Sequence, residues 1–188
     1  MSTNPIKLYS VKEYFEIEKN SDIKHEFVYG EIFAMSGASE RHNTIAFNLG
    51  GELYPQLKGT SCRGYISDMR TKVNDQLYYY PDVVVGCNIR LEIMDSLETL
   101  VNPILVVEVL SRSTAKFDRD TKFREYQQID SLRYYLLVAQ NEVNATLLTR
   151  QNDHSWTSIN YSNLENIIEL PLINSRLLMS DIYLNTSF

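Results

Sequence analysis

The chain has few of the residues that give small proteins unusual scaffolds. Among 188 residues there are 2 cysteines, 7 glycines and 5 prolines. Cys62 and Cys87 form no CxxC pair, so they predict neither a disulfide scaffold nor a zinc site. So little glycine and proline argues against a low-complexity linker. We therefore expect a single domain over residues 1–188.

Several other features are also missing. No apolar run approaches the roughly 18 residues that a membrane-spanning helix needs. Residues 1–20 lack the apolar middle of a signal peptide. The chain has no GxSxG, P-loop or GxGxxG motif, which disfavours a serine hydrolase and a nucleotide cofactor. These absences predict a cytoplasmic protein with no membrane partner.

Positive charge is scarce, with 18 Lys and Arg against 24 Asp and Glu and a net charge of −6. Such a balance disfavours tight, non-specific binding of nucleic acid over the whole surface. The charge is uneven, however. Residues 76–110 hold one Arg and five acids, whereas residues 111–135 hold six bases and four acids. This step from acidic to basic is either a solvated helix face or part of a site.

Hydrophobic periodicity predicts an α/β (α+β) fold with a central mixed sheet flanked by helices. A capping box at Ser10 starts an N-terminal helix that ends near Asn20, and a hairpin turns at Gly30. A second helix starts at Ser39 and is expected to end at Pro55 and Gly59. Residues 86–102 show no clear period and are expected to be irregular.

The second half of the chain predicts a strand–helix–strand crossover followed by a C-terminal β segment. Strands are expected over residues 62–73, 78–85, 104–110, 132–139, 145–150 and 156–161, with a helix over 115–128. The helix between two apolar runs predicts that strands 104–110 and 132–139 are parallel neighbours.

Glu108 stands inside the apolar run 104–110, which reads as a strand buried on both faces. A lone buried carboxylate is costly unless it is paired, protonated or bound to a metal. A solvated strand end, or an ion pair with a Lys or Arg of the next helix, would also explain it. Asp82 follows Pro81 at the start of another apolar strand, where an ordinary Pro-Asp turn is the alternative. Together the two carboxylates would suit Mg²⁺ or Mn²⁺.

The helix after Glu108 adds a third element. Asp118, Lys122 and Tyr126 are spaced four residues apart and so share one face. An exposed Asp–Lys pair is the simpler explanation. If that face packs on the sheet, the Lys122 ammonium could reach the two carboxylates and neutralise charge on a phosphate.

These residues also carry a resemblance. The motifs are Pro81–Val85, Pro103–Ser111, Ser113-Thr114, Asp118, Lys122, Tyr126, Tyr134–Val138, His25-Glu26, Gly30-Glu31 and His42-Asn43. The Pro-Asp and Glu pattern resembles the PD-(D/E)xK nuclease superfamily. Over about residues 10–185 the whole string is similar to the Uma-two family of restriction-endonuclease-like proteins. The superfamily places a lysine two residues after the acid, where this chain has Leu110. In the family that lysine has moved to the next helix, which points to Lys122.

The resemblance implies a restriction-endonuclease-like fold and a Mg²⁺- or Mn²⁺-dependent nuclease acting on DNA. A homodimer is expected, because nucleases that cut both strands of a duplex often pair through two-fold symmetry. Asp82 and Glu108 would hold the metal, Lys122 would deprotonate the attacking water and Glu26 would assist. Replacing Lys122 by Ala is expected to leave folding intact. Candidate substrate-binding residues are His42, Asp68, Arg70, Arg112, Lys116 and Tyr126.

Several of these residues also have explanations that involve no functional site. Glu26 and His42 could be surface residues, and Asp68 and Arg70 could form a polar sheet face. A non-catalytic member that binds nucleic acid or protein is the second hypothesis. A structural or interaction protein whose acids are solvated or paired is the third.

Overall fold

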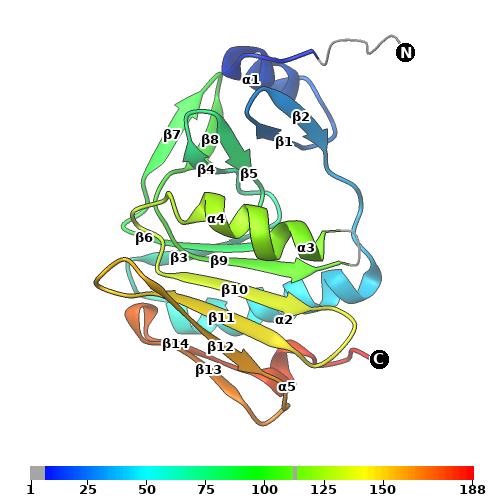
Figure 1. The fold of residues 1–188 in the computed structure, drawn as a ribbon, viewed down its shortest axis with the longest axis vertical. Coiled ribbons are helices and arrows are strands. Elements are labelled where there is room, and N and C mark those ends of the chain that lie inside the picture. Colours follow the sequence, from blue (N-terminus) through cyan, green and yellow to red (C-terminus); the bar gives the residue numbers. More distant parts are fainter. Residues whose placement is uncertain (1–6, 112–113) are drawn as a thin grey trace.

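The computed structural model describes residues 7–111 and 114–188. Two six-stranded sheets form its framework, and a two-stranded sheet lies beyond the lower one (Figure 1). The upper sheet is built mostly from the first hundred residues, whereas the lower, main sheet carries the strands of the predicted crossover. Short helices lie beside the main sheet on one side, and a long helix lies on the other.

The main sheet has the order β12-β11-β10-β9-β6-β3. Its strands are β3 (Cys62–Ile66), β6 (Val83–Cys87), β9 (Pro103–Leu110), β10 (Tyr134–Ala139), β11 (Ala145–Arg150) and β12 (Trp156–Tyr161). Strands β9 and β10 are parallel, and every other neighbouring pair is antiparallel. The predicted crossover is therefore confirmed, because the chain passes from β9 through short helices to β10.

The upper sheet has the order β2-β1-β5-β4-β8-β7. Its strands are β1 (His25–Val28), β2 (Glu31–Ala34), β4 (Thr71–Asn74), β5 (Leu77–Tyr79), β7 (Leu91–Met94) and β8 (Leu97–Leu100). Three predictions are corrected here. Residues 78–85 are not one strand, because β5 ends at Tyr79 in this sheet and β6 starts at Val83 in the main sheet. Residues 62–73 are not one strand, because the chain leaves β3 at Ser67, which has a positive φ of 52°, and enters the other sheet as β4. Residues 86–102 are not irregular, because they contain the β7–β8 hairpin.

The helices are mostly short. Helix α1 (Val11–Lys19) has the predicted capping box, with both Ser10 and Glu13 bonded as expected. Helix α2 (Glu40–Leu57) ends between Pro55 and Gly59, as expected, although it continues for two residues past Pro55. Proline removes only its own N–H bond to the carbonyl four residues earlier, so the last turn persists with one bond fewer.

The predicted helix 115–128 is interrupted. It consists of α3 (Ala115–Phe117), a π-helical turn (Asp118–Lys122) and α4 (Phe123–Tyr126). Near the C-terminus, β13 (Ile167–Leu170), a 3₁₀ turn (Pro171–Ile173), β14 (Ser175–Leu178) and α5 (Met179–Ile182) complete the fold. None of the helices in the described residues is long and apolar enough to span a membrane.

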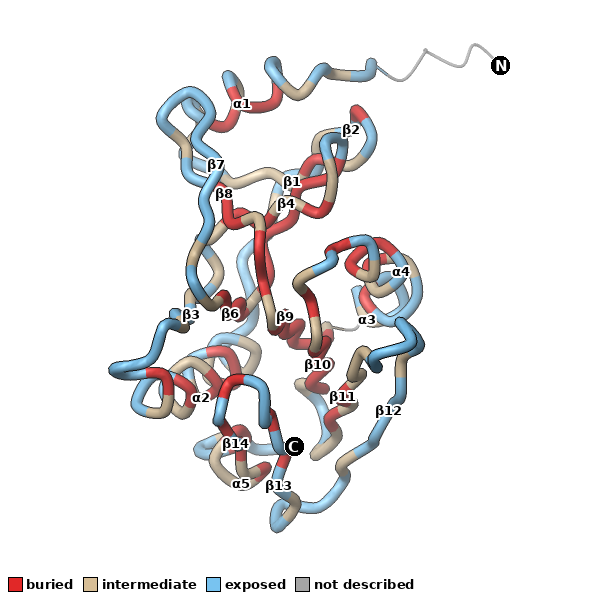
Figure 2. Tube along the Cα trace, turned by 90° about the vertical axis from the view of Figure 1, so that its left-hand side faces the viewer, coloured by how far each residue is buried: buried red, intermediate tan, exposed pale blue. Residues whose placement is uncertain are grey.

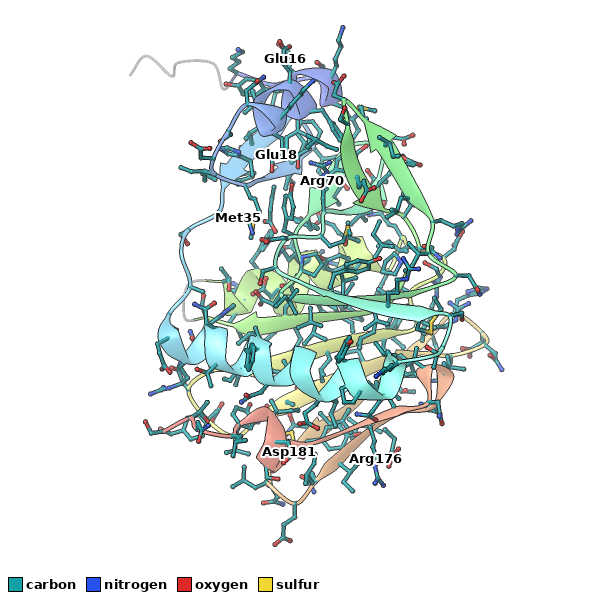
Figure 3. The ribbon with its side chains drawn as sticks, turned by 180° about the vertical axis from the view of Figure 1, so that it is seen from behind. Glu16, Glu18, Met35, Arg70, Arg176 and Asp181 are labelled. Atoms are coloured by element: carbon teal, nitrogen blue, oxygen red, sulfur yellow. A yellow bond between two sulfur atoms is a disulfide. The ribbon has the colours of Figure 1, made fainter. Side chains whose placement is uncertain are left out.

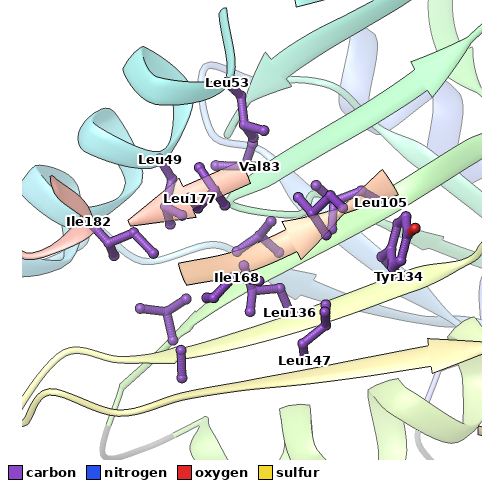
Figure 4. Packing of buried hydrophobic residues seen from close by; sticks show 14 of the residues in the cluster. Leu49, Leu53, Val83, Leu105, Tyr134, Leu136, Leu147, Ile168, Leu177 and Ile182 are labelled. Carbon is purple, nitrogen blue, oxygen red and sulfur yellow. The ribbon is translucent and has the colours of Figure 1, made fainter. Parts of the chain in front are cut away.

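The largest core lies between the main sheet and α2, and it also takes side chains from β13, β14 and α5 (Figure 4). Leu49 and Leu53 of α2 pack there with Leu105 and Leu136 of the sheet. A second core lies on the opposite face of the main sheet, under α4. Figure 2 shows the result: β9 and β10 are buried along most of their length, whereas β7 and β12 are largely exposed. Core residues on both faces explain why β9 reads as a continuous apolar run.

Cys62 and Cys87 are directly opposite each other on β3 and β6, and they form a disulfide. The sequence did not predict this pairing, because nothing in the spacing of two cysteines shows that their strands are neighbours. The disulfide ties an outer strand to the sheet, so it is a local link between two strands.

Candidate active site

Glu108 lies near the end of β9, between β6 and β10. Its neighbours along the strand pack into the cores on both faces of the sheet, and Glu108 itself is only 4% exposed. A solvated strand end is therefore ruled out. The alternative of an ion pair with the next helix holds, because Lys122 is the cation that meets this carboxylate.

Lys122 occupies the centre of the site. Its Nζ lies 3.0 Å from Glu26 Oε1, 3.3 Å from Glu108 Oε1 and 3.8 Å from Asp118 Oδ1. The ammonium also lies 4.7 Å from the centre of the Tyr79 ring, on its face. The helix that follows β9 packs back on the sheet, so Lys122 and Asp118 both point inward from the π-helical turn. π-helical turns occur often at functional sites.

Two buried tyrosine hydroxyls donate hydrogen bonds to residues of this cluster. Tyr126 donates to Glu108 Oε1 at 3.1 Å, and Tyr135 donates to the backbone carbonyl of Asp118 at 3.0 Å. Both tyrosines are completely buried. Tyr126 is therefore a hydrogen-bond donor beneath the site, and its predicted role in binding substrate is wrong.

Asp82 reaches the site from the residue just before β6. One of its oxygens, Oδ2, accepts the Val109 N–H at 2.7 Å and lies 3.2 Å from His42 Nε2. His42 comes from the first turn of α2, where Ser39 caps the helix. The side chains of Asp82 and His42 are 19% and 15% exposed, so this side of the site is the one closest to solvent.

Negative charge exceeds positive charge in this cluster. Burial raises the pKa of Glu108, Lys122 opposes that shift, and the carboxyl groups of Asp82, Asp118 and Glu26 raise it further. Burial also raises the pKa of Asp118. Four carboxyl groups thus interact around one ammonium, an excess of three negative charges when all are ionised. Such a cluster binds protons or cations readily.

For the two basic groups, Lys122 and His42, burial and the neighbouring carboxylates shift the pKa in opposite directions. Burial lowers the pKa of Lys122, but Glu108, Glu26 and Asp118 outweigh it and raise the pKa overall. The charged form of Lys122 is therefore favoured in this arrangement, and its expected role as the base that deprotonates water stays a prediction. Burial lowers the pKa of His42 as well, and the hydrogen bond to Asp82 reverses this and raises it.

Other predicted residues lie elsewhere. Arg70 is buried beneath α1, where its Nε donates to Thr99 and its guanidinium stacks 4.3 Å from the centre of the Phe15 ring. It cannot contact substrate there, and that prediction is wrong. Asp68 pairs with Lys24 near the surface. Lys116 is exposed on α3, and Arg112 lies outside the described residues.

Sequence reasoning missed two contributions. Asp118 was placed on the right helix face but was given no role at the site. Glu18 of α1 was not singled out, although it links β1, which carries Glu26, to Tyr80 in the segment that leads to Asp82. Its carboxylate accepts the backbone N–H of His25 at 3.1 Å and the hydroxyl of Tyr80 at 2.7 Å. Figure 3 shows Glu18 and Arg70 close together in this upper layer. Only the order of strands in space could have revealed this role.

The donor chemistry of the site fits a hard divalent cation. Carboxylate oxygens are the ligands that Mg²⁺ and Mn²⁺ prefer, and Asp82 and Glu108 supply them from neighbouring strands. In residues 7–111 and 114–188, no group of three or more His, Cys, Asp or Glu side chains is arranged to hold a metal. Two carboxylates are enough for a Mg²⁺ site of the kind that water and substrate phosphate complete.

Comparisons with known proteins agree with this architecture. The model of the family described as "Uma2: Putative restriction endonuclease" matches residues 11–179. The uncharacterized protein slr1290 of Synechocystis sp. is 36% identical over 185 residues, covering 98% of this chain and 96% of that protein. The uncharacterized protein sll1609 from the same organism is 34% identical over 151 residues, covering 80% and 85%.

A solved structure is also similar. The crystal structure of a putative nuclease belonging to DUF820 from Anabaena variabilis matches with a TM-score of 0.73 and 14% sequence identity. The match covers 92% of this chain and 96% of that one. At so low an identity the likeness concerns the fold, and it confirms the predicted restriction-endonuclease-like architecture.

Proposed function

The chain belongs to the Uma2 family, described as putative restriction endonucleases, and from this premise we propose that it is a metal-dependent nuclease that hydrolyses DNA phosphodiester bonds. One observation carries the proposal. The Lys122 ammonium, which comes from the helix after β9, lies within 3.3 Å of Glu108, the acid of the PD-(D/E)xK pattern. This contact supports the proposal that Lys122 takes the part of the lysine that the pattern places two residues after that acid.

Phosphodiester hydrolysis needs positioning and neutralisation of charge that develops on the phosphate. Lys122 is a fixed positive charge and a hydrogen-bond donor suited to a phosphate oxygen. Glu26, whose carboxylate lies 3.0 Å from Lys122 Nζ and is 16% exposed, is the candidate base for the attacking water. Its position at the edge of the cluster leaves it closer to solvent than Glu108.

Asp82 and Glu108 are the residues that would hold the divalent cation. When bound, such an ion polarises a phosphoryl oxygen and lowers the pKa of a coordinated water. His42 keeps one oxygen of Asp82 hydrogen-bonded, and the Val109 N–H bonds the same oxygen. These contacts fix the orientation of the Asp82 carboxylate, which is the usual role of groups that surround a ligand.

Contacts to the DNA backbone are proposed for exposed basic residues near the site. Lys116 and Arg119 lie on the outer side of the segment that carries Asp118 and Lys122 inward. His42 is close enough to solvent to meet a phosphate, and Arg112 belongs to the same stretch of sequence. Asp68 would act only through Lys24. Cleavage of both strands of a duplex requires two sites, which favours a homodimer.

We also propose that the protein is cytoplasmic, because it would encounter DNA in that compartment. Reducing conditions in that compartment disfavour disulfides. The Cys62–Cys87 pair would then be expected to be reduced in the cell, so the proposed site does not depend on it.

A cleavage assay with matched variants tests the proposal. The wild type is incubated with plasmid, linear and single-stranded DNA in Mg²⁺ or Mn²⁺. We expect cleavage that is lost in Asp82→Asn and Glu108→Gln. Asp120→Asn is the control, because Asp120 is an exposed carboxylate on the same π-helical turn. Cleavage that survives in both site variants would contradict the proposal. Salt-sensitive DNA binding without cleavage in either metal would favour the non-catalytic binding protein instead.

A further inference from the structure

The outer face of α2 carries large apolar side chains that no other described part of the chain covers. Phe47 is 72% exposed and Tyr54 is 70% exposed. They are seven residues apart, so they lie on one stripe of the helix. The inner face, with Ile45, Leu49 and Leu53, packs on the main sheet. Figure 3 shows α2 running along the outside of the molecule.

A groove of about 750 Å³ runs between this helix face and β3. Strand β3 is the last strand of the main sheet, and β6 is its one partner among the described strands. The N–H of Ser67 bonds the carbonyl of Asp82, and the N–H of Asn88 bonds that of Ser61. Along an antiparallel strand, every second residue directs its N–H and C=O toward the partner strand. The N–H and C=O of Gly64 therefore point away from β6, toward the groove. Uncovered edges of this kind readily pair with another chain.

Two glycines lie at the centre of the helix stripe. A Cβ at Gly51 would meet nothing within 4 Å, and one at Gly50 would meet Ile66 Cγ2 at 3.0 Å. Glycine in a helix is less stable than alanine. Packing within this chain therefore does not require glycine at position 51. A close approach of something outside the chain does explain it.

The stripe is nearly symmetric along its length. Phe47 lies three residues before Gly50, and Tyr54 lies three residues after Gly51. An acid, Glu40, stands at one exposed end and a base, Lys58, at the other. A two-fold axis through Gly50 and Gly51 would bring each aromatic ring against the partner's other aromatic ring. The same axis would bring each acid toward a base. Surfaces that complement themselves in this way form isologous dimers.

We propose that this face is the interface of a homodimer in which α2 of two copies packs antiparallel, with the groove and the β3 edge beside it. The proposal is independent of the nuclease function, because none of the groups that form the Lys122 cluster lies on this stripe. A second copy of the chain fits this face because both the apolar and the charged parts of the stripe are self-complementary.

Sedimentation equilibrium tests the proposal on the intact chain. The wild type is expected to have twice the 21.8 kDa mass of one chain. Phe47→Asp and Tyr54→Asp are expected to weaken the dimer at least about a hundredfold, since each puts a charge into an apolar interface. Both positions are exposed in one chain, so folding should persist, and circular dichroism checks this. Ile93→Asp is the control, because Ile93 is 67% exposed on β7 in the other sheet. A monomeric wild type, or a dimer lost only in the control, would overturn the proposal.

Two further variants test the antiparallel arrangement itself. Glu40→Lys and Lys58→Glu are each expected to weaken the dimer about tenfold, and the double variant is expected to restore it. Gly51→Cys is expected to form a disulfide between chains on oxidation, whereas Gly37→Cys, equally open in one chain, is not. Failure of the double variant to recover, or equal cross-linking at both positions, would overturn the two-fold α2 pairing.

Discussion

Lys122 is an internal counter-ion for carboxyl groups that come from separate parts of the chain. Helical periodicity in the sequence was enough to place it on one face with Asp118 and Tyr126. The contact with Glu26 could not be predicted in that way, because it joins residues 96 positions apart. The sequence also did not predict that Lys122 is buried. We therefore no longer expect that Lys122 can be removed without affecting folding.

Replacing Lys122 by Met should destabilise the protein by about 3–5 kcal/mol at neutral pH, because it leaves buried carboxylates without their cation. The loss should shrink as the pH falls toward 5. Lys122 is the positive charge that lowers the raised pKa values of Glu108 and Asp118. Without it those values rise further, so the folded variant gains protons and stability as the pH falls. Urea unfolding across pH measures this. Lys122→Arg, which keeps the charge, is the control, and a pH-independent loss would contradict the account.

His42 should contribute stability in its protonated form. Its pKa is raised overall by Asp82 in spite of burial, so the folded state holds the proton more tightly than the unfolded state. That contribution is fully present below the unfolded pKa of about 6.5 and is lost as pH rises through the folded pKa. We expect His42→Gln to cost about 1 kcal/mol below pH 6 and less above pH 8. Thermal unfolding at both pH values is the measurement, and a cost that grows with pH would argue against the pair.

At the scale of elements, the site depends on pieces that periodicity alone does not specify. The expected helix 115–128 is broken by a π-helical turn, a local change that leaves the apolar pattern intact. Arg70 was expected at the cleft because it alternates with Asp68, but the chain changes sheets between β3 and β4 and carries Arg70 beneath α1. Strand alternation holds only within one strand.

Helix α1 should help to hold the two sheets in register at the site. Glu18 accepts from His25, next to Glu26, and from Tyr80, two residues before Asp82. Replacing Glu18 by Ala should lower the free energy of unfolding by about 2–4 kcal/mol, because it leaves buried donors unpaired. It should also weaken Mn²⁺ binding, since Glu26 and Asp82 lose a common anchor. Glu16→Ala on the exposed side of α1 is the control. Unchanged Mn²⁺ binding in a less stable Glu18→Ala protein would limit Glu18 to a structural role.

At the scale of the whole molecule, the fold class and the main-sheet crossover could be predicted because β9 and β10 are buried and apolar. The β7–β8 hairpin of the second sheet was missed for the opposite reason. Strand β7 is exposed along its whole length, so it lacks the alternation that marks a half-buried strand. That residues 1–188 form one domain stays a prediction.

The net charge of −6 confines any DNA contact to local basic positions. We expect Lys116→Glu to weaken DNA binding about tenfold and to reduce its salt dependence by about one to two charges. Mn²⁺ affinity should not change, because Lys116 is exposed on α3 and the ion pairs of the carboxylate cluster are made by Lys122 instead. Fluorescence anisotropy at several salt concentrations measures both quantities for DNA. Lys12→Glu, on exposed α1, is the control, and equal losses in the two variants would point to a general charge effect.

The central claim is that Asp82 and Glu108 hold a divalent cation beside Lys122. Calorimetric titration of Mn²⁺ into the wild type, Glu108→Gln and Asp120→Asn tests it most directly, with a non-cleavable oligonucleotide present to supply a phosphate. The account predicts one saturable site per chain, weakened at least about tenfold in Glu108→Gln and unchanged in Asp120→Asn. Equal binding by all three proteins, or no binding by the wild type even with the oligonucleotide, would contradict it.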